Sequence, residues 1–140
     1  MIHLVLLDWF FLTFHTALVL FNMIGWAFRR TRRMNLISLA VTAASWTLMA
    51  RWYGLGYCVC TDWHWQVRRA LGYHDHSSTY IQFLVERLCG FVPNLTMTKN
   101  VSVAAFLVAA TLSIYLNIRD CRLLRHVKDG VPDAEVLHEG

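Results

Sequence analysis

The hydrophobic positions of this chain come in long blocks separated by shorter polar stretches. The first block, residues 9–28, has no charged side chain over its twenty positions. A helix of about twenty apolar residues crosses the roughly 30 Å hydrocarbon core of a bilayer. Two more blocks, residues 34–53 and 101–118, have a similar length. The pattern predicts an all-α membrane protein with three transmembrane helices, the first of which extends back to residue 8.

A line of polar side chains runs along the first block. Asp8, His15 and Asn22 are spaced seven residues apart, so they share one helix face and drift by about 20° per step. Such groups are costly in hydrocarbon and normally face protein or a water-filled cavity. We therefore expect the rest of the chain to cover this face. The Thr42 and Ser45 hydroxyls and the Trp46 indole, in the second block, are the expected partners.

Arginine placement predicts the topology. Four of the five residues 29–33 are arginine, with no acid nearby, and such short basic loops stay on the cytoplasmic side. Three crossings then leave the amino terminus outside and the carboxyl terminus inside. We expect residues 1–128 to form a single transmembrane helical domain, followed by a loose cytoplasmic tail at 129–140. At the outer end, Arg51 lies level with Asp8, which predicts an ion pair between them.

The outer segment, residues 54–100, predicts two short amphipathic helices. Thr61 can cap the first helix, and Gly72 ends it. The second begins after Thr79 and ends at Gly90. It is too short and too charged for a lipid-exposed span, so we expect it at the membrane interface or dipping partway in against the other helices.

His15 is the first candidate for cofactor chemistry. Together with Asn22 and Trp46 it could line a pocket for a quinone or another cofactor, or act as a proton relay. A haem would need a second axial ligand, and no other histidine lies within a predicted span of this chain. The competing interpretation is structural: a hydrogen bond that holds the first two helices together. The residues firmly imply no cofactor.

The outer segment also contains a cluster of metal-binding residue types. The candidate ligands are Cys58, Cys60, His64, His74 and His76, with Asp62 among them. Their types suit a transition metal, but their spacing matches no standard zinc motif. Because thiols tend to oxidise outside the cytoplasm, a disulfide from Cys58 or Cys60 to Cys89 is an alternative. The histidines could also simply solvate a polar turn.

Composition narrows the function further. Hydrophobic residues make up 56% of the chain, and the net charge of +4 comes from basic residues near the ends of the apolar blocks. There they face lipid headgroups, so we expect a lipid bilayer as partner and no nucleic acid. No nucleophile elbow or phosphate-binding loop is present, and we assign no catalytic residue.

The most specific stretch is residues 53–72, YGLGYCVCTDWHWQVRRALG. With His15, Asn22 and Trp46, it resembles a family of small bacterial membrane proteins classed only as a domain of unknown function. The resemblance covers residues 10–118 and is closest to Bacteroidota-type members, in which the second cysteine and the Thr-Asp-Trp-His-Trp run also occur. It implies a protein of the bacterial cytoplasmic (inner) membrane and no particular activity.

Two functional hypotheses follow. The first is a non-catalytic accessory or scaffolding subunit packed against a larger membrane complex or against its own copies, because pairs such as Ala40 and Ala44 let helices approach closely. The second is a redox or proton-handling membrane component. It would hold a quinone, haem or metal near His15, or use the outer Cys/His loop as a metal or thiol site.

Overall fold

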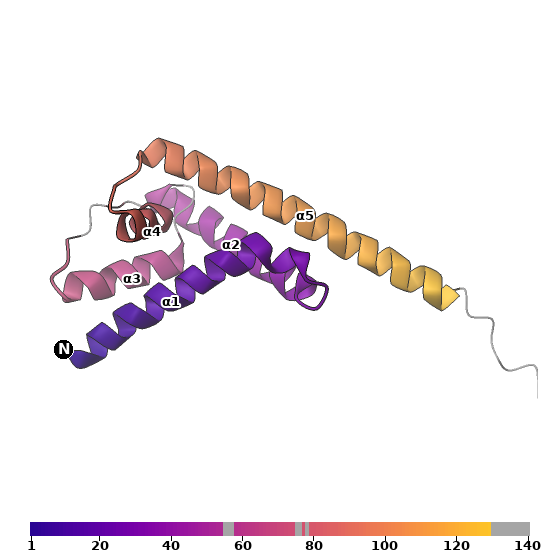
Figure 1. Ribbon diagram of the computed structural model, residues 1–140, viewed down its shortest axis with the longest axis horizontal. Helices are drawn as coiled ribbons and strands as arrows, with labels where there is room; N and C mark the ends of the chain where they lie inside the picture. The colour runs from indigo at the N-terminus through magenta and orange to yellow at the C-terminus, as the bar shows by residue number, and fades with distance from the viewer. Residues whose placement is uncertain (55–57, 75–76, 78, 130–140) are drawn as a thin grey trace, which may run out of the picture.

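The computed structural model describes residues 1–54, 58–74, 77 and 79–129, and all regular secondary structure among them is helical. The elements in chain order are α1 (Ile2–Ile24), the 3-10 turn η1 (Gly25–Ala27), α2 (Arg32–Tyr53), α3 (Val59–Ala70), α4 (Tyr80–Cys89) and α5 (Leu95–Asp129) (Figure 1). The predicted all-α class is confirmed.

Two segments are long and apolar enough to cross a membrane. They are Ile2–Ala27 and Leu95–Arg125, and only 11% and 17% of their most apolar windows are buried inside the chain. A core helix of a soluble protein would be mostly buried, so these segments turn their apolar surface outward. Helix α2 has a comparable length but carries three arginines and several hydroxyl side chains. The expectation of three transmembrane helices is therefore supported for two of them only.

The polar face of α1 points inward. Of the 23 residues of α1, the buried ones are Asp8, His15 and Asn22, whereas Phe10, Phe14 and other large apolar side chains are exposed. The expectation that the rest of the chain covers the polar line is confirmed. A helix with its polar side chains inside and its apolar side chains outside matches a lipid environment.

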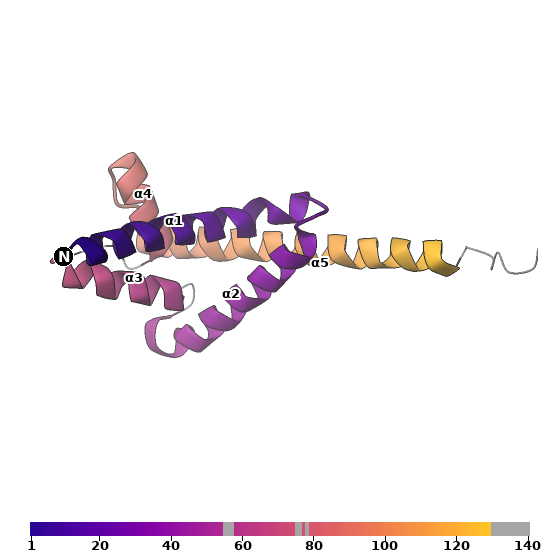
Figure 2. The ribbon, with the colours of Figure 1, turned by 90° about the horizontal axis from the view of Figure 1, so that it is seen from below.

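The helices pack around α1 and α5. Helix α1 lies against α3, α2 lies against α5, and the last turns of α5 project beyond the other helices (Figures 1 and 2). One apolar cluster joins α3 and α4 through Trp65, Tyr80 and Phe83. A second joins α2 to α5 through Leu39 and Phe106. These two clusters hold α3 and α4 at one end of the bundle and the α1–α2 turn at the other.

The helix ends match the sequence in part. Thr79 caps α4 by accepting a hydrogen bond from the Gln82 amide at 3.2 Å, and Gly90 ends it in a left-handed conformation with φ of 75°, as expected. The expectation that Thr61 caps the preceding helix is wrong. Cys58 holds the N-cap position of α3, and Thr61 lies buried within the first turn.

The last helix is longer than the predicted span. Helix α5 runs for 35 residues, from Leu95 to Asp129, whereas the apolar block covers only 101–118. Asn94 precedes it, and the Asn94 side chain accepts a hydrogen bond from the Met97 amide at 3.1 Å. The chain past the apolar block continues the same helix through Asp129 because no helix breaker comes before Gly130. The rest of the predicted tail, 130–140, lies outside the described residues.

Candidate functional site

A buried ionic group joins α1 to α3. His64 Nε2 lies 2.8 Å from Asp8 Oδ1, and Arg68 Nη1 donates to Oδ1 and Oδ2 of the same carboxylate at 3.2 and 3.4 Å. His64 and Arg68 are four residues apart on α3, so one helix face presents both to Asp8. The expected ion pair between Asp8 and Arg51 is wrong, because α3 rather than the end of α2 packs along this part of α1.

The surroundings of this group are aromatic. The His64 side chain is fully buried, and its ring packs against Phe11 and Trp65. The Arg68 guanidinium lies over the Phe83 ring at 4.8 Å from the centroid, an attractive cation–π arrangement. Burial lowers the pKa of His64 below its ordinary value of 6.5 and outweighs the hydrogen bond with Asp8, which raises it. His64 is therefore poised to stay neutral while Arg68 balances the carboxylate.

Two helical turns further along α1, His15 lies under Tyr80. The two rings stack with centroids 3.8 Å apart and an interplanar angle of 11°. The Tyr80 hydroxyl donates to the Leu12 carbonyl at 2.9 Å and is 3.0 Å from the Thr16 hydroxyl. These bonds fix the Tyr80 ring over one face of the His15 imidazole. The Nδ1 atom of His15 is buried and has no hydrogen-bond partner among the described residues.

The other nitrogen of His15 faces a thiol. Cys58 Sγ lies 3.5 Å from His15 Nε2 and 3.0 Å from the Thr61 hydroxyl, and the Cys58 side chain is buried. The backbone amide of Val59 donates to the Ser45 hydroxyl at 3.2 Å, which ties the start of α3 to α2. Three helices thus position one sulfur atom beside one imidazole.

The electrostatics of the site favour a thiolate at Cys58. The pKa of the Cys58 thiol is lowered from its ordinary 9.0 to about 4, first by the hydrogen bond with the Cys60 thiol and next by His15, although burial opposes this change. The Cys58 thiolate in turn raises the pKa of Cys60, and burial adds to that increase. Of the two neighbouring thiols, Cys58 is therefore the one at which the thiolate is favoured. An N-cap position stabilises negative charge as well, because free helix amides surround it.

The expected cofactor residues do not gather at one place. Asn22 lies two turns along α1 from His15, where it donates to the Thr42 hydroxyl at 3.0 Å and accepts from the Ser38 hydroxyl at 2.7 Å. The expected partnership with Thr42 is confirmed. The Trp46 ring packs on Phe106, with centroids 4.6 Å apart. Only His15 of the three meets a reactive side chain.

The expected metal ligands are separated in the same way. Cys58 and Cys60 lie together at the start of α3, His64 pairs with Asp8, and His74 is exposed after α3. His76 is outside the described residues. Within the described part of the chain, no three His, Cys, Asp or Glu side chains are arranged to hold a metal ion. All four cysteines are free thiols, and Cys89, the expected disulfide partner, is exposed at the end of α4.

Sequence reasoning found both His15 and Cys58 but did not pair them. The two residues are 43 positions apart, and each was assigned to a different kind of site. The sequence did contain a signal for the pairing. Asp8 and His15 share one face of α1. The next amphipathic helix has Cys58 at its start and His64 and Arg68 on its polar face. In such an apolar chain, two polar helix faces of similar length are expected to pack against each other, away from lipid.

The comparisons with known proteins identify a family. A family model described as a protein of unknown function (DUF2784) matches residues 5–118, a range that contains Asp8, His15, Cys58, His64 and Arg68. No curated protein and no solved structure matches the chain. The expected resemblance to a domain-of-unknown-function family is confirmed, and this chain belongs to the DUF2784 family.

Proposed function

We propose that this protein is a membrane-bound thiol redox protein, in which Cys58 is the reactive thiolate and Cys60 the second thiol. The observation that carries the proposal is the contact of 3.5 Å between Cys58 Sγ and His15 Nε2, at the N-cap of α3. A thiolate beside an imidazole and at a helix N-terminus is the arrangement that makes a cysteine nucleophilic at neutral pH. The Thr61 hydroxyl adds a third polar contact to the sulfur.

The proposed reaction is reduction of a disulfide in a partner protein or small molecule. The Cys58 thiolate attacks one sulfur of that disulfide, the S–S bond breaks, and the other sulfur leaves as a thiolate. The Cys60 thiol then gives its proton to the leaving thiolate and attacks Cys58 Sγ. This second exchange forms a Cys58–Cys60 disulfide and frees the reduced substrate, so two electrons pass from the cysteine pair to the substrate. His15 stabilises the Cys58 thiolate until it attacks.

The proposed location is the outer interface of a bacterial inner membrane, in a Bacteroidota-type member of the family. Its support is the two apolar segments Ile2–Ala27 and Leu95–Arg125 and the basic loop between them. With α2 as a third crossing, the amino terminus and the thiol site lie outside and the carboxyl terminus lies in the cytoplasm. The buried polar face of α2 against α1, which includes Thr42, supports this third crossing.

The test is the pH dependence of alkylation of the full-length protein in detergent. Each cysteine is labelled with iodoacetamide between pH 5 and pH 9 and is quantified by peptide mass spectrometry. The rate at Cys58 should stay level down to about pH 5, because its thiolate persists there. The exposed Cys89 is the internal reference, because the alkylation rate of an ordinary exposed thiol falls about tenfold per pH unit below about pH 8.5. His15→Gln should move the Cys58 profile toward that of Cys89.

A second measurement tests the exchange itself. Incubation with oxidised glutathione should yield a Cys58–Cys60 disulfide, and Cys60→Ser should accumulate a mixed disulfide at Cys58. Cys121→Ser, a change at an exposed cysteine on α5, is the matched control and should alter neither result. A Cys58 profile identical to that of Cys89, together with no mixed disulfide in Cys60→Ser, would overturn the proposal.

A second candidate function, the accessory subunit, rests on a different surface. Ala40 and Ala44 are both exposed on α2, beside the exposed Val41 and Leu48. Such an edge of small residues allows close approach of another membrane helix. Extraction in a mild detergent followed by native electrophoresis should show the chain running with other subunits or with its own copies. Ala40→Leu with Ala44→Leu should release it, and migration of the wild type as a monomer would exclude this function.

A further inference from the structure

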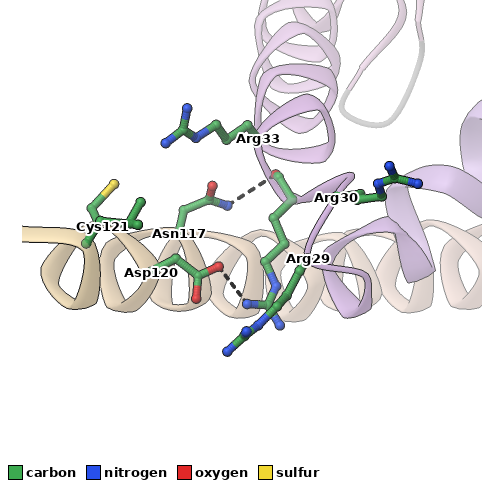
Figure 3. A pocket seen from close by; sticks show the side chains of 8 residues that line it. Arg29, Arg30, Arg33, Asn117, Asp120 and Cys121 are labelled. Atoms are coloured by element: carbon green, nitrogen blue, oxygen red, sulfur yellow. Dashed lines mark hydrogen bonds and ion pairs between the residues drawn. The ribbon is translucent and has the colours of Figure 1, made fainter. Parts of the chain in front are cut away.

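A cavity lies at the opposite end of the molecule from the thiol site. It has a volume of about 310 Å³ and lies where the turn between α1 and α2 meets α5 (Figure 3). Its lining residues are Arg29, Arg30, Arg32, Arg33, Asn117, Asp120, Cys121 and Leu124. We call it the arginine cavity. Its volume is at the lower end of the range for small-molecule sites.

One of the four arginines has a structural role. Arg32 is buried, its Nη1 donates to Asp120 Oδ2 at 2.6 Å, and its Nε donates to the Trp26 carbonyl at 3.1 Å. Asn117 Nδ2 donates to the Arg32 carbonyl at 3.2 Å and to the Ser113 carbonyl at 2.8 Å. These bonds fasten the start of α2 to α5 and give the cavity a rigid wall.

The other three arginines are not neutralised. The side chains of Arg29, Arg30 and Arg33 are exposed, and among the described residues none of them forms an ion pair within 4 Å or a side-chain hydrogen bond. Arg29 is close enough to Asp120 to interact with its charge, which Arg32 already pairs directly. Figure 3 shows that Arg29 and Arg33 extend on either side of Asn117. Asp120 is the one carboxylate in the lining, and Arg32 already occupies it. The cavity therefore has excess positive charge that an anion can balance.

The location of the cavity limits which anion can reach it. The apolar segment Ile2–Ala27 ends two residues before Arg29, and the apolar segment Leu95–Arg125 passes along the opposite wall. Leu124 adds an apolar side chain to the lining. The opening is therefore at the level where lipid headgroups lie. A headgroup can enter while its acyl chains stay against the apolar faces of α1 and α5.

We propose that the arginine cavity binds a phosphate group, carried by the headgroup of an anionic phospholipid. Guanidinium groups present paired donors that match two oxygens of a phosphate. Arg29 and Arg33 supply those donors. Arg32 and Asn117 fix the position of α2 against α5 beside them. This site is separate from the thiol chemistry at the other end of α1, so either proposal can fail without the other.

The test uses the full-length protein in a non-ionic detergent and counts bound lipid by native mass spectrometry. Short-chain phosphatidylglycerol should give a saturable single adduct, and short-chain phosphatidylcholine should bind far more weakly. Arg29→Gln with Arg33→Gln should weaken phosphatidylglycerol binding about 25-fold, since each basic residue near an anionic headgroup contributes about fivefold. The matched control is Arg51→Gln with Arg87→Gln, which removes the same charge from exposed positions outside the cavity and should leave binding unchanged.

Competition separates the two sources of phosphate. Inorganic phosphate at millimolar concentration should not displace phosphatidylglycerol if a lipid is the natural ligand. Displacement at low concentration would still support a phosphate site, with a soluble phosphate as its ligand. Equal binding by wild type and the Arg29/Arg33 double variant, or an equal loss in the Arg51/Arg87 control, would overturn the proposal. Circular dichroism checks that each variant is folded before binding is measured.

Discussion

The two ends of α1 deal with charge in opposite ways. Near its start, Asp8 is buried and shared between His64 and Arg68, and aromatic rings surround the group. Beyond its end, the arginine cavity holds one paired cation, Arg32, and three exposed ones. The same residue types thus form a closed internal network at one end and an open cationic surface at the other.

The difference follows from which helices cover each end. Helices α3 and α4 close over the start of α1 and exclude water, so each ionisable group there needs a partner within the chain. At the other end, the start of α2 and the passing α5 leave three arginines exposed, and water or lipid headgroups can solvate them. We therefore expect substitutions at the first end to affect folding and substitutions at the second end to affect binding.

The largest expected effect is the loss of Asp8. Asp8→Asn leaves the buried Arg68 without its carboxylate, and breaking a buried ion pair in this way costs about 3–5 kcal/mol. Asp120→Asn is the matched change at the other end. There the carboxylate is 29% exposed and its ion pair is open to solvent, so we expect a much smaller cost. The measurement is the free energy of unfolding in detergent, followed by circular dichroism.

This pair of variants tests the comparison directly. Equal costs for Asp8→Asn and Asp120→Asn would show that the start of α1 is not sealed from water as described. Arg68→Gln should reproduce most of the Asp8→Asn effect, because it breaks the same pair from the other side. A double variant of both residues should cost less than the sum of the two, as expected for groups in contact.

A smaller effect is expected in the last turn of α1. Asn22 joins α1 to α2 through the Ser38 and Thr42 hydroxyls. Asn22→Leu removes both hydrogen bonds and should lower the free energy of unfolding by about 1–2 kcal/mol, in line with polar contacts between membrane helices. Asn100→Leu, at an exposed position of α5, is the control and should be close to neutral. An Asn22→Leu variant as stable as wild type would contradict the role of Asn22 as a link between the helices.

The buried face of α1 could be predicted from the sequence because its polar residues recur at a regular spacing. Asp8, His15 and Asn22 repeat every seven residues, and a helix converts such spacing directly into one side. The structure buries these three residues of α1 and leaves the apolar ones outside. The amphipathic helices α3 and α4 were predictable for the same reason, since their faces and end residues are local properties of the chain.

The partners across helices were harder to predict. Counting residues from the loop at 29–33 gave a depth for each side chain, and this placed Arg51 level with Asp8. Depth alone does not say which helix is adjacent, and α3 fills the position instead. The thiol site depended in addition on the start of α3 at Val59 rather than after Thr61. That start places Cys58 at the N-cap with its sulfur beside His15. The sequence suggested a metal, a disulfide or a thiol site in this segment, but gave no link from it to His15.

The smallest expected effect concerns pH and the buried His64. Burial lowers its pKa below 6.5 in the folded protein, so the unfolded chain binds a proton more readily. The stability that this group contributes is complete above pH 6.5 and is lost as the pH falls toward the folded pKa.

His64→Gln removes the proton-binding group, so it should flatten part of the pH dependence of the unfolding free energy between pH 7.5 and 5.5. The lowered pKa of Cys58 also makes the unfolding free energy rise with pH, between about pH 4 and pH 9. The His64 contribution is the difference between the wild-type curve and the His64→Gln curve, because both proteins keep Cys58. His74→Gln, at an exposed histidine, should leave the slope unchanged. If His64→Gln and His74→Gln changed the slope equally, the imidazole of His64 would have to be open to water, and the closed network at the start of α1 would not hold.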